Sequence, residues 1–116
     1  MTALSTHVLD LSTGRPAARV AVRLYRRASY ADPLLVASAV TDTDGRARLI
    51  EPGLLAAGLY RLAFEIGDYF ALAGAAVSDP PFLDVVVIDF AVADAARHHH
   101  VPLLVSPYGY STYRGS

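Results

Sequence analysis

The chain has 116 residues, of which 53% are hydrophobic and 18% charged, a balance typical of a folded protein, and we predict a single domain over residues 1–116. The formal net charge is −1 and the ten basic residues are all arginines, which argues against a basic nucleic-acid-binding surface and excludes Schiff-base chemistry by lysine. The absence of cysteine excludes disulfides, thiolate catalysis and cysteine-based zinc sites.

Two features of the sequence bear on location. No apolar run approaches the roughly 20 residues that a helix needs to cross a bilayer. The first residues also lack the basic segment and apolar core of a secretory signal. We therefore expect no membrane association and a cytoplasmic location.

Strands are predicted wherever apolar and polar residues alternate with a period of two. Between residues 20 and 26, for example, Val20, Val22 and Leu24 share the face expected to be buried. The same pattern, or enrichment in β-branched residues, predicts eight strands in all, over residues 5–11, 20–26, 34–41, 46–50, 59–66, 84–92, 101–105 and 108–113.

Turn and helix signals separate these strands. Residues 12–16 have the composition of a turn, and Asp44-Gly45 indicates a hairpin that leads into residues 46–50. Alternation breaks at residues 68–74, where an aspartate start and a glycine stop favour a helix of about two turns. Short strands with frequent turns and one short helix predict an all-β fold, a two-sheet β-sandwich.

The C-terminal segment, residues 98–116, carries three consecutive histidines and two strands joined at Ser106-Pro107. Alternation divides the first strand into two faces. The buried face is expected to hold His99, Val101, Leu103 and Val105, and the opposite face His98, His100, Pro102 and Leu104. Two histidines on one face admit a metal site with His7 as a third ligand, and the alternative is a solvated strand start.

Four motifs give the chain a resemblance to a known family. They are Thr-His-Val-Leu-Asp at residues 6–10, Asp-Gly-Arg at 44–46, His-Val-Pro-Leu-Leu at 100–104 and Tyr-Arg-Gly-Ser at 113–116. Together they resemble the 5-hydroxyisourate hydrolases of the transthyretin-like family, and the resemblance covers the whole chain. It implies two four-stranded sheets, with a helix after the fifth strand.

The resemblance also implies the activity and its residues. It assigns catalysis to His7, Arg46, His100 and Ser116, without a metal or cofactor. We also expect substrate binding by His98, which shares the face of His100, and by Tyr113 of the terminal motif. The implied reaction is hydrolysis of 5-hydroxyisourate to 2-oxo-4-hydroxy-4-carboxy-5-ureidoimidazoline in urate degradation. Where the family usually has tyrosine this chain has His99, which we interpret as a structural substitute that forms a hydrogen bond near the start of its strand.

Residue chemistry is consistent with this hydrolysis. Histidine titrates near neutral pH and can act as general acid or base, and a nearby guanidinium favours neutral imidazole and can stabilise an oxyanion. The sequence alone leaves open which histidine is the base. The alternatives are a metal-dependent hydrolase that uses His7, His98 and His100, and a transthyretin-like carrier of a small ligand, which would lack the His/Arg/His set.

An assembly is also predicted. His7, Leu9, His100, Pro102 and Leu104 alternate with core residues, so we expect a single chain to leave them exposed. Burial of the apolar members by a second copy, together with the resemblance, predicts a homotetramer, a dimer of dimers with its sites at a subunit interface.

Overall fold

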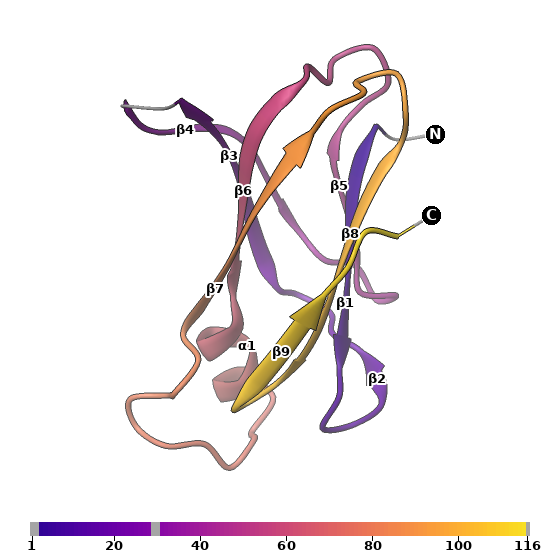
Figure 1. The fold of residues 1–116 in the computed structure, drawn as a ribbon. Coiled ribbons are helices and arrows are strands. Elements are labelled where there is room, and N and C mark those ends of the chain that lie inside the picture. Colours follow the sequence, from indigo (N-terminus) through magenta and orange to yellow (C-terminus); the bar gives the residue numbers. More distant parts are fainter. Residues whose placement is uncertain (1–2, 29–30, 116) are drawn as a thin grey trace.

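The structure, a computed structural model, describes residues 3–28 and 31–115. Within these residues the alternating segments form two packed sheets with a short helix at one end (Figure 1). The strands are β1 (Leu4–Asp10), β2 (Arg15–Pro16), β3 (Ala21–Ala28), β4 (Ala31–Val40), β5 (Arg46–Ile50), β6 (Gly58–Glu65), β7 (Val85–Val92), β8 (His99–Ser106) and β9 (Gly109–Thr112), and the helix is α1 (Ile66–Leu72). The predicted two-sheet sandwich is therefore confirmed.

The first sheet has the order β2-β1-β8-β9, and β5 joins the same edge of β1 as β2. Its central pair, β1 and β8, is parallel, although the two strands come from opposite ends of the chain. The second sheet, β4-β3-β6-β7, is antiparallel throughout. The long-range pairing of β1 with β8 brings the N-terminal motif beside the histidine run.

The core lies between the sheets and is made from the residues that alternation predicted. Val20, Val22 and Leu24 are fully buried, and Leu62 and Phe64 from β6 pack in the same cluster. Truncation of a buried phenylalanine such as Phe64 to alanine typically costs about 3–5 kcal/mol. The outer faces carry polar side chains together with exposed apolar ones such as Leu59 and Val87.

Residues 12–16, which were predicted to be a turn, include a short fifth strand of the first sheet. The turn itself is present, because Gly14 has a φ of +73° and its N–H donates to the Asp10 carbonyl at 2.8 Å. It brings Arg15 and Pro16 back against Asp10 and Leu9 as β2. The sheets therefore have five and four strands, not four and four.

The Asp44-Gly45 turn is also present, but the prediction that it forms a β-hairpin is wrong. β4 belongs to the second sheet and β5 to the first, so the turn carries the chain from one sheet to the other. Thr41 fixes the departure from β4, since its buried hydroxyl accepts from the Val20 N–H and donates to the Ala17 carbonyl. β5 then pairs with β1 instead of β4.

The helix begins two residues earlier than predicted, at Ile66, and ends at Leu72. Its first N–H groups are satisfied from outside, because Ile66 and Gly67 both donate to the Asp84 carbonyl, at 2.9 and 2.8 Å. That contact is remote in sequence, so the local pattern could not reveal it. Among the described residues, no helix has both the length and the apolar character required to cross a membrane.

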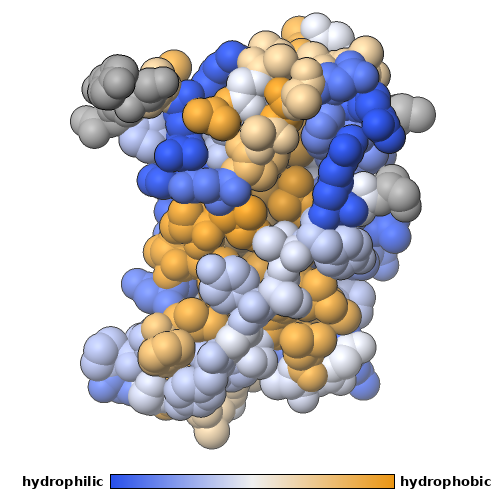
Figure 2. Space-filling model, in the orientation of Figure 1, coloured by the Kyte–Doolittle hydropathy of each residue, from blue (hydrophilic) through white to orange (hydrophobic). Residues whose placement is uncertain are grey.

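Hydrophobic side chains are exposed on the side of the molecule between β7 and β9 (Figure 2). Val85 and Val87 on β7 are 39% and 41% exposed, and Phe82 before β7 is 69% exposed, with its ring tilted against that of Tyr108 at 6.0 Å between centroids. Both strands are sheet edges. Exposed apolar edges of this kind are typical of surfaces that pair with another chain.

Candidate functional site

Three adjacent strands of the first sheet bring the predicted catalytic residues together. His7 on β1 is paired with Arg46 on β5 and with Pro102 on β8, and Ser5 is paired with Arg48 and with His100. Residues paired in this way project from the same face of a sheet. The register therefore places the two predicted catalytic histidines and the predicted arginine on one outer face.

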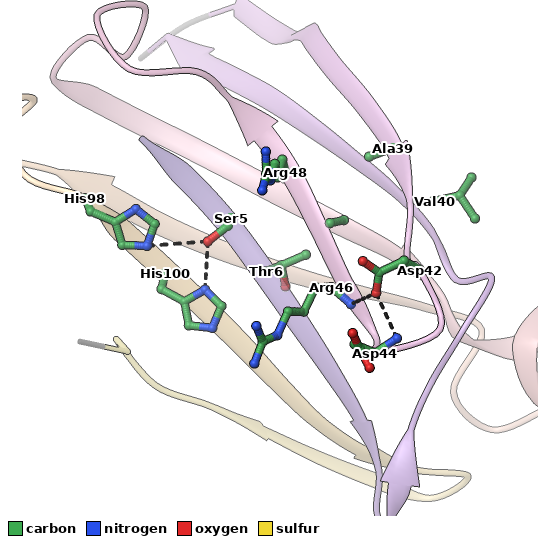
Figure 3. Close-up of a pocket in the computed structure, with 11 residues that line it drawn as sticks. Ser5, Thr6, Ala39, Val40, Asp42, Asp44, Arg46, Arg48, His98 and His100 are labelled. Carbon is green, nitrogen blue, oxygen red and sulfur yellow. Dashed lines mark hydrogen bonds between the residues drawn. The ribbon is translucent and has the colours of Figure 1, made fainter. Parts of the chain in front are cut away.

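A groove of about 790 Å³ lies on this face (Figure 3). Its lining residues come from β1, β4, β5, the turn between β4 and β5, and the histidine run: Ser5, Thr6, Ala39, Val40, Asp42, Asp44, Arg46, Ala47, Arg48, His98 and His100. Arg46, His98 and His100 thus share the groove, as predicted. The ring of His7 is 6.4 Å from the ring of His100, centroid to centroid.

Arg46 is held at the start of β5 by the preceding turn. One Asp42 carboxylate oxygen accepts the N–H groups of Asp44, at 2.9 Å, and Arg46, at 3.0 Å. The hydrogen bond from the Arg46 N–H is the main reason that the pKa of Asp42 lies below its usual value. Gly45 has a φ of +76°, and a Cβ there would lie 2.5 Å from the Val8 carbonyl oxygen. Only glycine fits this crossing without displacement.

His100 is half-buried and is bound on one side by Ser5, whose Oγ lies 2.8 Å from Nδ1. Burial is the main cause that lowers the pKa of His100 below its ordinary value of 6.5, and repulsion from His98, His7 and Arg46 lowers it further. At neutral pH the ring is therefore neutral, which is the form that a general base requires.

His98 lies immediately before β8, and its side chain lines the groove. Its ring is stacked near that of His100, with centroids 6.1 Å apart, and its Nε2 lies 3.5 Å from Ser5 Oγ. The predicted sharing of a face by His98 and His100 is thus preserved, and β8 begins at His99, two residues before the predicted strand.

His99 has the structural role that the sequence predicted. It is 5% exposed on the core side of β8, and its Nδ1 donates to the Arg97 carbonyl at 2.9 Å. Its backbone N–H donates to Ala3 across the start of the sheet. The middle histidine of the run therefore faces away from the groove.

The C-terminal segment returns to the site through Gly115. Its N–H donates to the His100 carbonyl at 2.7 Å, and a Cβ on Gly115 would lie 2.7 Å from Cδ2 of the His100 ring. Tyr113 is 59% exposed and does not contribute to the groove lining. Ser116 lies outside the described residues, so the roles given to Ser116 and Tyr113 stay predictions.

The face that was expected to be exposed in a single chain is in fact largely covered. Pro102 is buried, and His7, Leu9, His100 and Leu104 are half-buried. β8 is a central strand flanked by β1 and β9, which explains the covering of Pro102. The Thr112 hydroxyl on β9 also donates to the Pro102 carbonyl at 2.7 Å. The argument for assembly from exposure of this face is therefore weaker than the sequence suggested.

Sequence reasoning did not identify Ser5 as a site residue. Its signal was available, since Ser5 lies two positions before His7 and therefore shares its face. The metal alternative was identified, but in the described part of the chain no three His, Cys, Asp or Glu side chains are gathered in a way that could hold an ion. The three histidines thus do not form a preorganised ligand set.

A family model, described as the HIUase/Transthyretin family, matches residues 4–115. The chain belongs to this family. It is 61% identical, over the full length of both proteins, to a protein of Caulobacter vibrioides named 5-hydroxyisourate hydrolase. A relative that is named as an enzyme is therefore highly similar to this chain over its whole length.

Solved structures of the HIUase/Transthyretin family share the fold. The structure of 5-hydroxyisourate hydrolase from Klebsiella pneumoniae is 42% identical, with a TM-score of 0.80, and the match covers 97% of this chain and 98% of that one. Sea bream transthyretin in complex with thyroxine is 30% identical, with a TM-score of 0.86 and coverage of 97% and 94%. The backbone therefore resembles those of a 5-hydroxyisourate hydrolase and of a transthyretin bound to thyroxine about equally, and the side chains of the groove must distinguish the two.

Proposed function

We propose that this protein hydrolyses 5-hydroxyisourate to 2-oxo-4-hydroxy-4-carboxy-5-ureidoimidazoline, a step of urate degradation in the cytoplasm. The observation that carries the proposal is the convergence of Arg46 and His100, whose pKa is lowered by burial, on one groove, with His7 beside them. The identity of 61% to a named 5-hydroxyisourate hydrolase supports it independently.

His100 acts as the general base in this proposal. Its Nε2 takes a proton from a water molecule, and the resulting hydroxide adds to a ring carbonyl carbon of the substrate. The lowered pKa of His100 keeps the lone pair available at neutral pH. General base catalysis of this kind typically contributes about 10²–10⁴-fold to the rate.

Arg46 stabilises the negative charge that develops on the carbonyl oxygen. Its guanidinium is a planar group with five N–H donors, suited to an oxyanion or to an anionic substrate. Collapse of the intermediate breaks the C–N bond, and the protonated His100 returns its proton to the leaving nitrogen. His7, in register with Arg46, orients the substrate or shares this proton transfer.

The remaining predicted residues complete the site. His98 lines the groove beside His100 and binds substrate. Gly115 contacts His100, so the residue that follows it, Ser116, is assigned to orient substrate or water. Tyr113 is assigned to substrate binding from the resemblance of the Tyr-Arg-Gly-Ser ending. The reaction as written needs no metal or cofactor.

The active unit in this proposal is a homotetramer, a dimer of dimers. The exposed apolar residues on the β7 and β9 side, and the half-buried Leu9 and Leu104 near the site, are the surfaces that favour contact between copies. Leu104→Glu should then weaken assembly and activity together while the sandwich stays folded. Light scattering that finds a fully active monomer at the assay concentration would overturn the interface model.

The test of the reaction is the decay of freshly generated 5-hydroxyisourate, followed by ultraviolet absorbance with and without the protein. Acceleration that persists after exhaustive chelation supports the metal-free reaction. Acceleration that is lost on chelation and restored by a divalent metal would favour the metal-dependent alternative. No acceleration, together with tight binding of an aromatic ligand such as thyroxine, would favour the carrier.

A further inference from the structure

The hydroxyl of Ser5 lies between two histidines of the groove. Its Oγ is 2.8 Å from Nδ1 of His100 and 3.5 Å from Nε2 of His98, and both contacts are drawn in Figure 3. The parallel pairing of β1 with β8 fixes this arrangement, because it places Ser5 directly opposite His100. Nothing in the reaction described above requires a hydroxyl at this position.

A serine hydroxyl has one proton to donate and lone pairs to accept. If Ser5 donates to one histidine and accepts from the other, the chain His100–Ser5–His98 has two arrangements. In the first, His100 Nδ1–H donates to Ser5 and Ser5 donates to His98 Nε2, which leaves His100 Nε2 with a lone pair. In the second, every bond is reversed and His100 Nε2 carries the proton. The first gives a base, whereas the second gives an acid in the resting enzyme.

The charges around His100 favour the first arrangement. Figure 3 shows the Arg46 side chain extending from β5 toward the His100 ring, and Arg46 is one of the groups that disfavour a charged His100. A guanidinium has only donors, so a proton on a ring nitrogen that faces it is repelled. A proton on Nδ1 instead has the oxygen of Ser5 as its acceptor.

We infer that Ser5 is a positioning residue, which holds the proton of neutral His100 on Nδ1 and thereby presents Nε2 to the groove as the base. The catalytic role of Ser5 in this inference rests on the proposed hydrolysis. It identifies which nitrogen of which histidine acts, and it gives the serine of the N-terminal strand a role.

The same hydrogen bond serves both protonation states of the ring. When Nε2 takes a proton from water, Nδ1 keeps its own proton and still donates to Ser5, so the ring need not rotate between the two steps. A hydrogen bond from a charged imidazolium is stronger than one from the neutral ring, which favours the intermediate. Ser5 therefore acts through the base, His100.

Kinetics of three variants test this role. Ser5→Ala should lower kcat about tenfold, with KM within about twofold, because one hydrogen bond to a group that becomes charged is lost. Ser5→Thr retains the hydroxyl and should retain kcat within about threefold. Ser38→Ala makes the same change at an exposed position of β4, on the other sheet, and should leave kcat unchanged. A normal kcat in Ser5→Ala would overturn the inference.

Nitrogen-15 NMR of the imidazole rings tests the inference independently of activity. At about pH 8, where His100 is neutral, the wild-type ring should be the Nδ1–H tautomer, and Ser5→Ala should shift the population toward Nε2–H. A wild-type ring that is mainly Nε2–H would overturn the inference even if no variant were folded. Absence of hydroxyisourate hydrolysis by the wild type would instead refute the proposed function, while the tautomer would still report on Ser5.

Discussion

The two sheets carry arginines on their outer faces, but among the described residues the ion pairs of these arginines with carboxylates lie on one sheet. On the β4-β3-β6-β7 sheet, Arg23 lies 2.9 Å from Glu65, and Arg61 binds Asp89 through two hydrogen bonds of 2.7 and 3.0 Å. In the described part of the first sheet, Arg46 and Arg48 form no ion pair, although Asp42 and Asp44 line the same groove. Asp42 is occupied instead with backbone N–H groups of the turn.

This difference separates structural charges from functional ones. An arginine whose donors are filled by a neighbouring carboxylate has little capacity for a ligand, and its pKa is raised further, as for Arg61 beside Asp89. An arginine that faces imidazoles instead leaves its donors for an incoming oxygen and keeps the imidazoles neutral. The second sheet is thus expected to tolerate changes of charge that the first sheet does not.

The largest effect is expected at the proposed base. His100→Asn should lower kcat/KM by about 10²–10⁴-fold, because a base of this kind contributes that much. His7→Asn should lower it roughly tenfold or more, because His7 lies beside His100 but does not line the groove. The matched control is His99→Tyr, at the inward-facing histidine of the same run. Near-normal turnover in both Asn variants would remove the proposed site.

The second prediction compares the same substitution on the two sheets. Arg46→Lys should lower kcat/KM by about 10–100-fold, because an ammonium cannot replace the planar fork at a developing oxyanion. Arg61→Lys, on the second sheet, should leave the rate within about twofold, because Arg61 binds Asp89 far from the groove. The rates of hydroxyisourate decay measure both. Equal losses in the two variants would contradict the distinction between the sheets.

Two glycines near the end of the chain provide a third comparison. Gly115→Ala should lower the rate about tenfold, because its Cβ would displace the His100 ring, and displacement of a catalytic group by about 1 Å has effects of this order or larger. Gly109→Ala places its Cβ 3.9 Å from the nearest neighbour and should be nearly silent. Circular dichroism should find both variants folded. Full activity in Gly115→Ala would show that the terminal segment does not position His100.

The sequence predicted most of what depends on local pattern. Period-2 alternation identified the core faces of β3 and β8, and it separated His99 from its two neighbours. The break in this alternation predicted the helix, and the predicted glycine stop is present in the structure, because Gly74, with a φ of +74°, follows the end of α1. These features depend on residues that lie within a few positions of one another, so a local pattern contains them.

The features that the sequence did not reveal depend on contacts between distant segments. The helix start depends on the carbonyl of Asp84, and β5 joins the first sheet by pairing with β1, where Arg46 lies opposite His7. The contact of Ser5 with His100 joins residues 95 positions apart. Parallel register between β1 and β8 cannot be derived from either strand alone, so the partner of the proposed base became visible only in the fold.

The fourth prediction concerns pH. Because the pKa of His100 lies below 6.5, kcat/KM should stay on its plateau down to that value and fall only at lower pH, where the base becomes protonated. Repulsion from His98 contributes to the lowering. His98→Asn should therefore raise the pKa of His100 and move the acidic limb to higher pH. A limb above pH 6.5 in the wild type, or no shift in the variant, would contradict this assignment.

The smallest effect is expected from the charges of the second sheet. Asp89→Asn removes the carboxylate that pairs with Arg61 at 2.7 Å and with Arg27 at 3.7 Å. Because Asp89 is 39% exposed, the free energy of unfolding should fall by less than about 1 kcal/mol, and high salt should reduce the difference between variant and wild type. Urea unfolding at two salt concentrations measures both effects.

The pH dependence of that small difference has a defined sign. The hydrogen bond between Asp89 and Arg61 is the main cause that holds the pKa of Asp89 below 3.8 in the folded state. The carboxyl group therefore binds a proton more readily in the unfolded chain. The stabilisation is therefore present above pH 3.8 and is lost as the pH falls through the folded-state pKa, and Asp89→Asn should abolish this dependence. Hydroxyisourate hydrolysis by Asp89→Asn should match the wild type. A loss of activity as large as that of Arg46→Lys would mean that paired charges on the second sheet also support function, and the contrast between the two sheets would fail.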